Sequence, residues 1–283
     1  MKSVNLALAA ALTLATPLRA QEVSMTPSFI DTPQGRLAIY EQGKGNGLPV
    51  LFLHADSGIA GQWAEVLPAI AAGRRVIALD SRGSAASAKA ADGDYSYDGR
   101  AGDIAVVAEA KNLARFVIVA HSGSGAAALV YAAQNPDRVA GLFLLDPATD
   151  PRVLPKEIRD GIVAGLAGPQ SLDFQKQFYA TIAGSDERVR ARVLADCAKV
   201  LPEARLGFGK AFAQWNPEAA LDAWKGPIFI LAGEASDTGA ALYRLRPRIP
   251  YEVVKGTGHW LQLDAPDIVA EAIRRFLARI EPK

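Results

Sequence analysis

The sequence contains little sulfur and few imidazole groups. Its 283 residues include one cysteine, Cys197, and three histidines. A single cysteine excludes an intramolecular disulfide. No cluster of cysteine and histidine has the spacing of metal ligands, so we expect a protein that works without a metal or another cofactor.

An excess of charge of one sign and a long apolar segment are also missing. Charged residues make up 22% of the chain, and the formal net charge is +1. There is no basic run and no interleaving of basic and aromatic residues, which argues against a nucleic-acid partner. The apolar run from Leu6 to Ala15 is too short to span a bilayer, so no stable membrane span is expected. No pattern predicts an oligomeric state.

Residues 1–20 have the pattern of a secretory signal peptide. Lys2 supplies a positive charge, the apolar run of Leu6 to Ala15 follows, and the small residue Ala20 precedes Gln21. We expect cleavage near Ala20 and a periplasmic or secreted protein.

Short apolar runs alternate with helical patterns over most of the chain, and apolar residues make up 50% of it. This rhythm predicts an α/β fold whose parallel sheet is covered by helices on both faces. The strands are expected near 28–31, 36–42, 50–54, 75–80, 116–120, 141–146, 228–232 and 251–255.

The alternation of strand and helix patterns stops after Asp146-Pro147. From Ala148 to about Lys225 the pattern is helical, with helices expected near 155–166, 171–182, 187–200 and 203–215. We therefore predict one core, made of residues 21–147 and 226–283, and a helical cap of residues 148–225. A cap over the carboxyl ends of the strands would cover a site there and shape its pocket.

One strand runs directly into a turn of small residues. The buried strand 116–120 is followed by His121-Ser122-Gly123-Ser124, and an alanine-rich helix pattern begins at Ala126. A serine on such a sharp turn exposes its Oγ near a helix N-terminus, where backbone N–H groups can hold an oxyanion. Ser124 also has small neighbours and is a second candidate.

This turn resembles the nucleophile elbow of the α/β-hydrolase family, Gly-x-Ser-x-Gly, with Ala120 and Ser124 in place of the two glycines. The segment Asn135-Pro136-Asp137 follows at the family's usual distance, which favours Ser122 as the nucleophile. The resemblance implies a mostly parallel eight-stranded sheet flanked by helices, with the cap between the sixth and seventh strands. It also implies a triad of serine, histidine and a carboxylate.

His259 is the expected base, because it follows the last strand between Gly258 and Trp260; His121 and His54 are expected to be structural. The family usually places the acid just after the seventh strand, which implies Asp237. The spacing is one residue longer than usual, so Glu234 stays an alternative. Some relatives place the acid after the sixth strand, so Asp146 and Asp150 are alternatives as well.

The family's oxyanion hole implies the backbone N–H groups of Gly123 and Asp56. The Asp56 carboxylate is expected to point away, because it would repel the developing negative charge.

Four aromatic residues are candidates for the pocket: Trp63, Phe178, Phe212 and Trp260. The predicted function is a serine hydrolase that cleaves a carboxylic ester of a small molecule through an acyl-enzyme, with the triad Ser122, His259 and Asp237. Alternatives are lactone opening, C–C bond hydrolysis or perhydrolysis on the same triad. An alternative of another class is a non-catalytic homologue that binds a small ligand.

Overall fold

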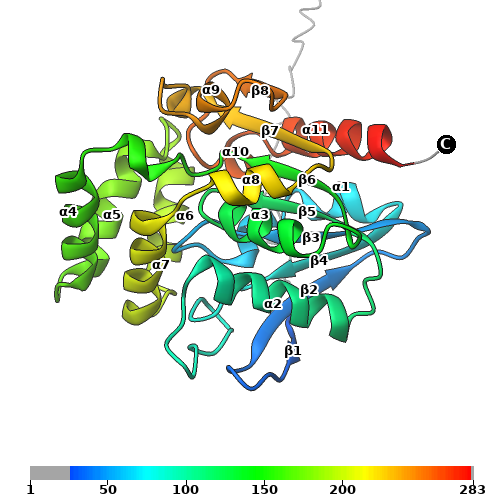
Figure 1. Ribbon diagram of the computed structural model, residues 1–283, viewed down its shortest axis with the longest axis horizontal. Helices are drawn as coiled ribbons and strands as arrows, with labels where there is room; N and C mark the ends of the chain where they lie inside the picture. Colours follow the sequence, from blue (N-terminus) through cyan, green and yellow to red (C-terminus); the bar gives the residue numbers. More distant parts are fainter. Residues whose placement is uncertain (1–25, 282–283) are drawn as a thin grey trace, which may run out of the picture.

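The computed structural model describes residues 26–281, so the predicted signal peptide lies outside the described residues (Figure 1). All eight predicted strands are present and form one sheet in the order β1-β2-β4-β3-β5-β6-β7-β8. The strands are β1 Ser28–Ile30, β2 Leu37–Gln42, β3 Gly47–Leu53, β4 Arg74–Leu79, β5 Phe116–His121, β6 Val139–Leu145, β7 Ile228–Gly233 and β8 Tyr251–Val254.

The strands β3 to β8 are all parallel, whereas β2 runs antiparallel to both of its neighbours, β1 and β4. The carboxyl ends of β3, β5, β6, β7 and β8 therefore lie at the same edge of the sheet. The loops that follow these five strands carry the candidate site residues, as expected for ligand sites in open parallel sheets.

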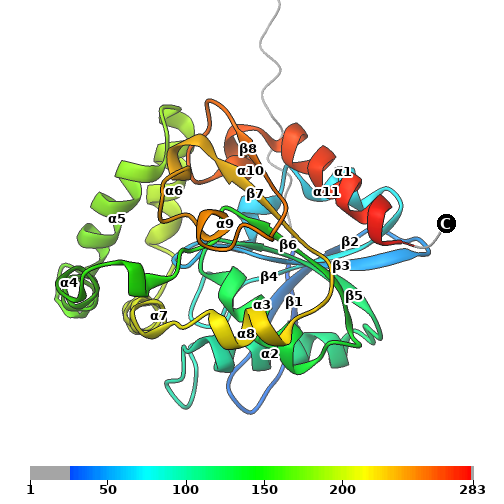
Figure 2. The same cartoon turned by 45° about the horizontal axis from the view of Figure 1, so that its top comes forward.

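Helices cover both faces of the sheet (Figure 2). Alternate residues of a strand point to opposite faces, so Val117 and Val119 of β5 pack with α1 (Leu67–Ala71) and α11 (Pro266–Ile280). Ile118 and Ala120 of the same strand pack on the other face, where α2 (Tyr97–Ala110), α3 (Ser124–Gln134) and α8 (Glu218–Ala223) lie. Burial on both faces explains why these strands are apolar throughout.

The predicted helical insertion between β6 and β7 is present. It contains α4 (Lys156–Ala167), α5 (Ser171–Ile182), α6 (Glu187–Cys197) and α7 (Pro202–Gln214), followed by α8. Helices α4 to α7 stand beyond the edge of the sheet, on the left in Figure 1, whereas α8 returns to the layer beside α3. The fold is thus the predicted α/β-hydrolase fold.

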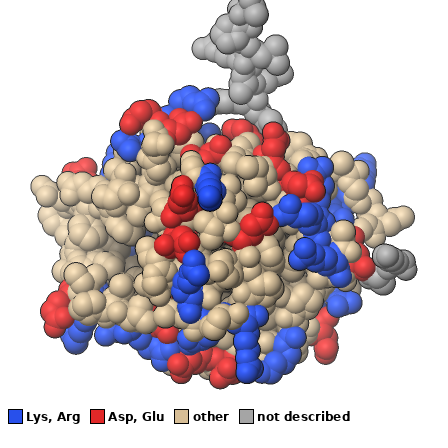
Figure 3. All heavy atoms as spheres, turned by 90° about the horizontal axis from the view of Figure 1, so that it is seen from above, with Lys and Arg blue, Asp and Glu red and all other residues tan. Residues whose placement is uncertain are grey.

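Short elements complete the loops. They are the 3-10 turns η1 Ala60–Trp63, η2 Pro151–Val153 and η3 Glu234–Ser236, and the short helices α9 Leu242–Leu245 and α10 Leu261–Asp264. Along residues 26–281, every helix is too short or too polar to cross a membrane. Acidic and basic side chains are interspersed on the face shown in Figure 3.

Candidate active site

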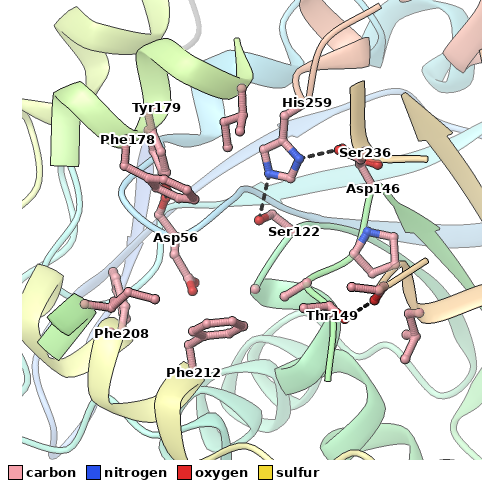
Figure 4. Close-up of a pocket in the computed structure, with 18 of the residues that line it drawn as sticks. Asp56, Ser122, Asp146, Thr149, Phe178, Tyr179, Phe208, Phe212, Ser236 and His259 are labelled. Atoms are coloured by element: carbon pink, nitrogen blue, oxygen red, sulfur yellow. Dashed lines mark hydrogen bonds and ion pairs between the residues drawn. The ribbon is translucent and has the colours of Figure 1, made fainter. Parts of the chain in front are cut away.

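Ser122 occupies the sharp turn between β5 and α3. Its backbone has a φ of +57°, a left-handed conformation that costs a residue with a side chain about 1–3 kcal/mol. The turn is held by hydrogen bonds from the Ser122 N–H to the Leu145 carbonyl (3.0 Å) and from the Gly125 N–H to the Ser122 carbonyl (2.9 Å). This strained turn places the Ser122 hydroxyl in the pocket at the carboxyl edge of the sheet (Figure 4).

The residues after Ser122 show why small side chains are needed here. A Cβ atom at Gly123 would collide with the Asp56 carboxylate, so a larger residue here would have to displace a side chain that Arg100 holds. Ser124 is 1% exposed. Its hydroxyl donates to the His54 carbonyl and accepts a hydrogen bond from Arg100 Nη2 at 2.5 Å. Ser124 is therefore engaged inside the fold, and Ser122 presents the accessible hydroxyl.

His259 lies beside Ser122. Its Nε2 is 2.9 Å from Ser122 Oγ. The loop after β8 reaches this position because its backbone packs tightly on the end of α5: the His259 N–H donates to the Ile182 carbonyl at 2.9 Å, and a Cβ at Gly258 would collide with the Ala183 backbone. The imidazole also packs edge-on against Trp260, which fixes the plane of the ring.

The other ring nitrogen of His259 contacts Asp146. Nδ1 lies 2.5 Å from Asp146 Oδ2. The same carboxylate accepts hydrogen bonds from the Ser236 hydroxyl (2.6 Å) and the Gly233 N–H (3.2 Å). Asp146 is 2% exposed and has a φ of +41°, so its carboxylate is buried and aimed at the imidazole. A serine, a histidine and a carboxylate are thus joined by two hydrogen bonds, as in a catalytic triad.

The structure does not bring Asp237 to His259, so the prediction of this residue as the partner of His259 is wrong. The turn η3 directs Ser236 inward to Asp146, and the following Asp237 binds Arg244 Nη2 and the Tyr243 hydroxyl, each at 2.9 Å. The hydrogen bond from Arg244 lowers the pKa of Asp237, with a smaller contribution from Tyr243.

The two other alternative acids also have different partners. Glu234 accepts a hydrogen bond from the Gly256 N–H at 2.9 Å. Asp150 binds Arg152 through both carboxylate oxygens. Among the four carboxylates considered from the sequence, Asp146 is the one that contacts the imidazole of His259.

The two remaining histidines are buried and hydrogen-bonded. His121 Nε2 lies 2.8 Å from the His259 carbonyl, and burial, together with the neighbouring His259, lowers the pKa of His121 well below its ordinary value. His54 Nε2 accepts from the Ser81 N–H at 2.9 Å, and burial lowers its pKa as well. Both histidines therefore stay neutral and support the loops of the site.

The predicted oxyanion donors line the same pocket as Ser122. Within residues 26–281, the backbone N–H groups of Asp56 and Gly123 have no hydrogen-bond acceptor. Such N–H groups are available to an oxygen atom that gains negative charge next to Ser122 Oγ.

The Asp56 side chain does not point away from the pocket, so that expectation is wrong. Figure 4 shows its carboxylate projecting into the pocket near Ser122. The buried Arg100 of α2 makes this possible, because its Nη1 lies 2.7 Å from Asp56 Oδ1 and compensates the negative charge. Arg100 also binds Ser124, so one guanidinium joins the two segments that carry the oxyanion donors. No sequence pattern pointed to Arg100, because its partners lie more than twenty residues away in either direction.

The pocket has a volume of about 430 Å³ and lies between the sheet edge and the inserted helices. Phe178 and Phe212 line it, as predicted. Trp63 and Trp260 do not, because both are fully buried: Trp63 packs against Phe52, and Trp260 packs behind His259. The inserted helices contribute Ile162, Leu166, Phe174, Gln175, Phe178, Tyr179, Ile182, Arg205, Phe208, Gly209 and Phe212 to the lining.

Comparisons with known proteins identify relatives of the whole chain. A 2-(acetamidomethylene)succinate hydrolase of Mesorhizobium japonicum is 28% identical over 267 residues, covering 86% of this chain and 92% of that protein. The dihydrolipoyllysine-residue acetyltransferase component of the acetoin cleaving system of Pseudomonas putida is 27% identical over 246 residues, covering 85% of this chain but only 66% of that protein.

The fold has many solved counterparts, among them a bromoperoxidase of Bacillus anthracis, with a TM-score of 0.78 and 22% identity over 89% of this chain and 100% of that one. Other similar proteins are named as esterases, as a lactone-degrading enzyme and as a semialdehyde hydrolase. The family model described as alpha/beta hydrolase fold matches residues 49–266. The chain therefore belongs to the α/β-hydrolase fold family.

Proposed function

We propose that the protein is a serine hydrolase that cleaves a carboxylic ester of a small molecule through an acyl-enzyme. The observation that carries the proposal is the continuous hydrogen-bonded series from Ser122 Oγ through both nitrogens of His259 to Asp146. This series lies in the wall of a largely apolar pocket. A serine hydroxyl is a poor nucleophile at neutral pH, and it needs an adjacent base of this kind.

In the first half of the reaction, Ser122 Oγ attacks the ester carbonyl carbon while His259 Nε2 takes its proton. Asp146 keeps the other proton on Nδ1 and stabilises the imidazolium that forms. The N–H groups of Asp56 and Gly123 hold the carbonyl oxygen as it becomes negative. When the C–O bond breaks, His259 returns the proton to the leaving alcohol, and the acyl group stays on Ser122.

In the second half, water attacks the acyl-enzyme carbonyl and gives its proton to His259 Nε2. The tetrahedral species then releases the carboxylic acid, and the proton returns to Ser122 Oγ. The apolar side chains of α5 and α7 limit the water in the pocket, which strengthens the electrostatic interactions at the reacting atoms.

Relatives named as esterases support the choice of an ester. C–C bond hydrolysis on the same triad is the second candidate, because one relative is named 2-hydroxymuconate semialdehyde hydrolase. Lactone opening and perhydrolysis use the same triad. A purely ligand-binding role does not require the Ser122–His259–Asp146 geometry.

Periplasmic or secreted localisation remains a proposal that rests on residues 1–20, and N-terminal sequencing of the protein from its host tests it.

A series of p-nitrophenyl esters from acetate to dodecanoate tests the proposed function. We expect hydrolysis with a maximum at short to medium acyl chains, because the pocket volume is about 430 Å³. An organophosphonate ester should label the protein once, and peptide mass spectrometry should place the label on Ser122. A protein inactive on the whole series contradicts the ester assignment, and lactones and diketones assayed beside it then decide among the alternatives.

Arg100→Met is expected to reduce kcat/KM about 10²–10³-fold, similar to the loss of one oxyanion donor. The substitution leaves the Asp56 carboxylate uncompensated beside Gly123, where it opposes the negative charge of the transition state. Steady-state kinetics on the best ester of the series would measure this loss, and thermal unfolding would show whether the variant is folded.

The double variant Asp56→Asn/Arg100→Met should recover part of this activity, because the uncompensated charge is gone. Arg75→Met is the control, since Arg75 pairs with Glu41 at the opposite end of the sheet. A double variant no more active than Arg100→Met would show that the effect is not electrostatic.

A further inference from the structure

One face of α7 lines the pocket, and it carries a single charged residue. Arg205, Phe208, Gly209 and Phe212 recur at helical spacing, and all four line the cavity. Arg205 is 4% exposed, whereas the charged Lys210 on another face of the same helix is exposed. Arg205 is thus a buried charged residue on a helix face that is otherwise apolar and lines a cavity.

The hydrogen bonds of Arg205 leave part of its guanidinium without a partner. Nη1 donates to the carbonyls of Cys197 (3.2 Å) and Val200, at the turn between α6 and α7. Nε is buried and has no partner, and along residues 26–281 no carboxylate pairs with the guanidinium within 4.0 Å. Burial lowers the pKa of Arg205, although the negative charge of Glu203 opposes this shift. A guanidinium carries five N–H donors, and a buried cation is costly unless an anion compensates it.

The carboxylates of the pocket do not supply that anion. Asp56 pairs with Arg100 at 2.7 Å, and Asp146 is bound to His259. Both carboxylates in the lining are thus engaged, and Arg205 is the one lysine or arginine among the residues that line the described pocket. Neither carboxylate of the lining is therefore free to pair with Arg205, and an anionic group of a molecule that enters the pocket would compensate its charge.

We infer that Arg205 binds a carboxylate of the substrate, so that the substrate class is an ester with a second, free carboxylate away from the scissile bond. With Nη1 engaged at the α6–α7 turn and Nε buried, Nη2 is the donor left for a carboxylate, and a charge-assisted N–H···O bond is stronger than a neutral one. This inference rests on the proposed ester hydrolysis at Ser122. It adds a specificity determinant on the inserted helices, on the pocket wall formed by α7.

The test compares charged and neutral esters of the same size. The charged probes are mono-p-nitrophenyl adipate, with the carboxylate on the acyl side, and 4-carboxyphenyl hexanoate, with the carboxylate on the alcohol side. The neutral counterparts are the methyl ester of the first probe and phenyl hexanoate. The wild type should prefer at least one charged probe to its neutral counterpart.

In Arg205→Met we expect kcat/KM on the preferred charged probe to fall roughly 10–100-fold, the range of a hydrogen-bonded charge pair, mainly through KM. The neutral counterpart should change less than about threefold by the same reasoning, since it makes no such pair. Arg205→Lys should keep part of the preference, because the positive charge remains. Lys210→Met, which removes an exposed charge from the same helix, should behave like the wild type.

Two outcomes would overturn the inference. An equal loss on charged and neutral esters in Arg205→Met, not rescued by Arg205→Lys, would make Arg205 a structural residue of the α6–α7 turn. No preference of the wild type for either charged probe would also reject it. In both cases ester hydrolysis, and with it the proposed function, would stand.

Calorimetric titration with adipate measures the carboxylate site without catalysis. The wild type and Lys210→Met should bind adipate, and Arg205→Met should not. Adipate binding without any ester hydrolysis would reject the proposed function and keep the carboxylate site. Absence of adipate binding to the wild type would reject the carboxylate site, whatever esters are hydrolysed.

Discussion

Ser122→Ala is expected to lower kcat/KM for ester hydrolysis about 10⁵–10⁶-fold, the scale of removing a catalytic serine. The hydroxyl that forms the acyl-enzyme is then missing, and His259 has no nucleophile to deprotonate. The variant should fold normally, since alanine removes only a partly exposed hydroxyl. The measurement is the initial rate with the best p-nitrophenyl ester, together with the loss of organophosphonate labelling.

Ser124→Ala is the matched control for the second serine of the turn. It removes the partner of Arg100 Nη2 and of the His54 carbonyl, so a loss of roughly 10–100-fold is expected from this one charged hydrogen bond. Labelling at Ser122 should persist. Full activity in Ser122→Ala with none in Ser124→Ala would transfer the nucleophilic role to Ser124.

The fold could be predicted from the sequence because its strands are buried on both faces and its helices separate them regularly. Val117 and Ile118 are both fully buried, although they point to opposite faces of the sheet. The turn around Ser122 was recognisable because a buried strand runs directly into small residues, and Gly123 is small where its backbone lies against Asp56.

The carboxylate that contacts His259 could not be predicted from its distance after a strand alone. Asp146 and Asp237 follow neighbouring parallel strands, so their loops meet at the same edge of the sheet. What separates them is the direction of each side chain: Asp146 has a φ of +41° and turns inward, whereas Asp237 follows the turn η3 and faces Arg244. The sequence did contain one signal: Ser236 stands at the position where the family usually has the acid. In the structure its hydroxyl binds the carboxylate of Asp146.

The roles of residues that act through contacts far apart in the chain could not be predicted from the sequence either. Arg100 reaches Asp56 and Ser124 only after α2 packs beside α3. Trp260 follows His259 directly, but it packs against Tyr179 on the buried side of the loop and leaves the pocket to smaller side chains. Side-chain direction in loops depends on such packing, which a residue pattern does not contain.

Asp146→Asn is expected to reduce kcat about 10⁴-fold, whereas Asp237→Asn should leave kcat within about threefold of the wild type. An asparagine amide can donate to His259 Nδ1, which shifts the proton of the ring to Nε2. A protonated Nε2 cannot accept the proton of Ser122 Oγ, although the 2.9 Å contact itself is preserved. The asparagine keeps the size of the buried side chain, so the variant should stay folded. Its thermal unfolding midpoint should therefore lie close to that of the wild type.

Asp237→Asn is the matched control, because the same chemical change is made in the neighbouring loop on a side chain that contacts Arg244 and Tyr243 instead of His259. The two variants are compared by steady-state kinetics at one pH on one ester. The reverse ranking, a large loss in Asp237→Asn and a small loss in Asp146→Asn, would mean that the loops rearrange when substrate binds. The hydrogen bonds from Ser236 and Gly233 argue against such a rearrangement, because Asp146 would have to leave both donors inside a buried site for Asp237 to replace it.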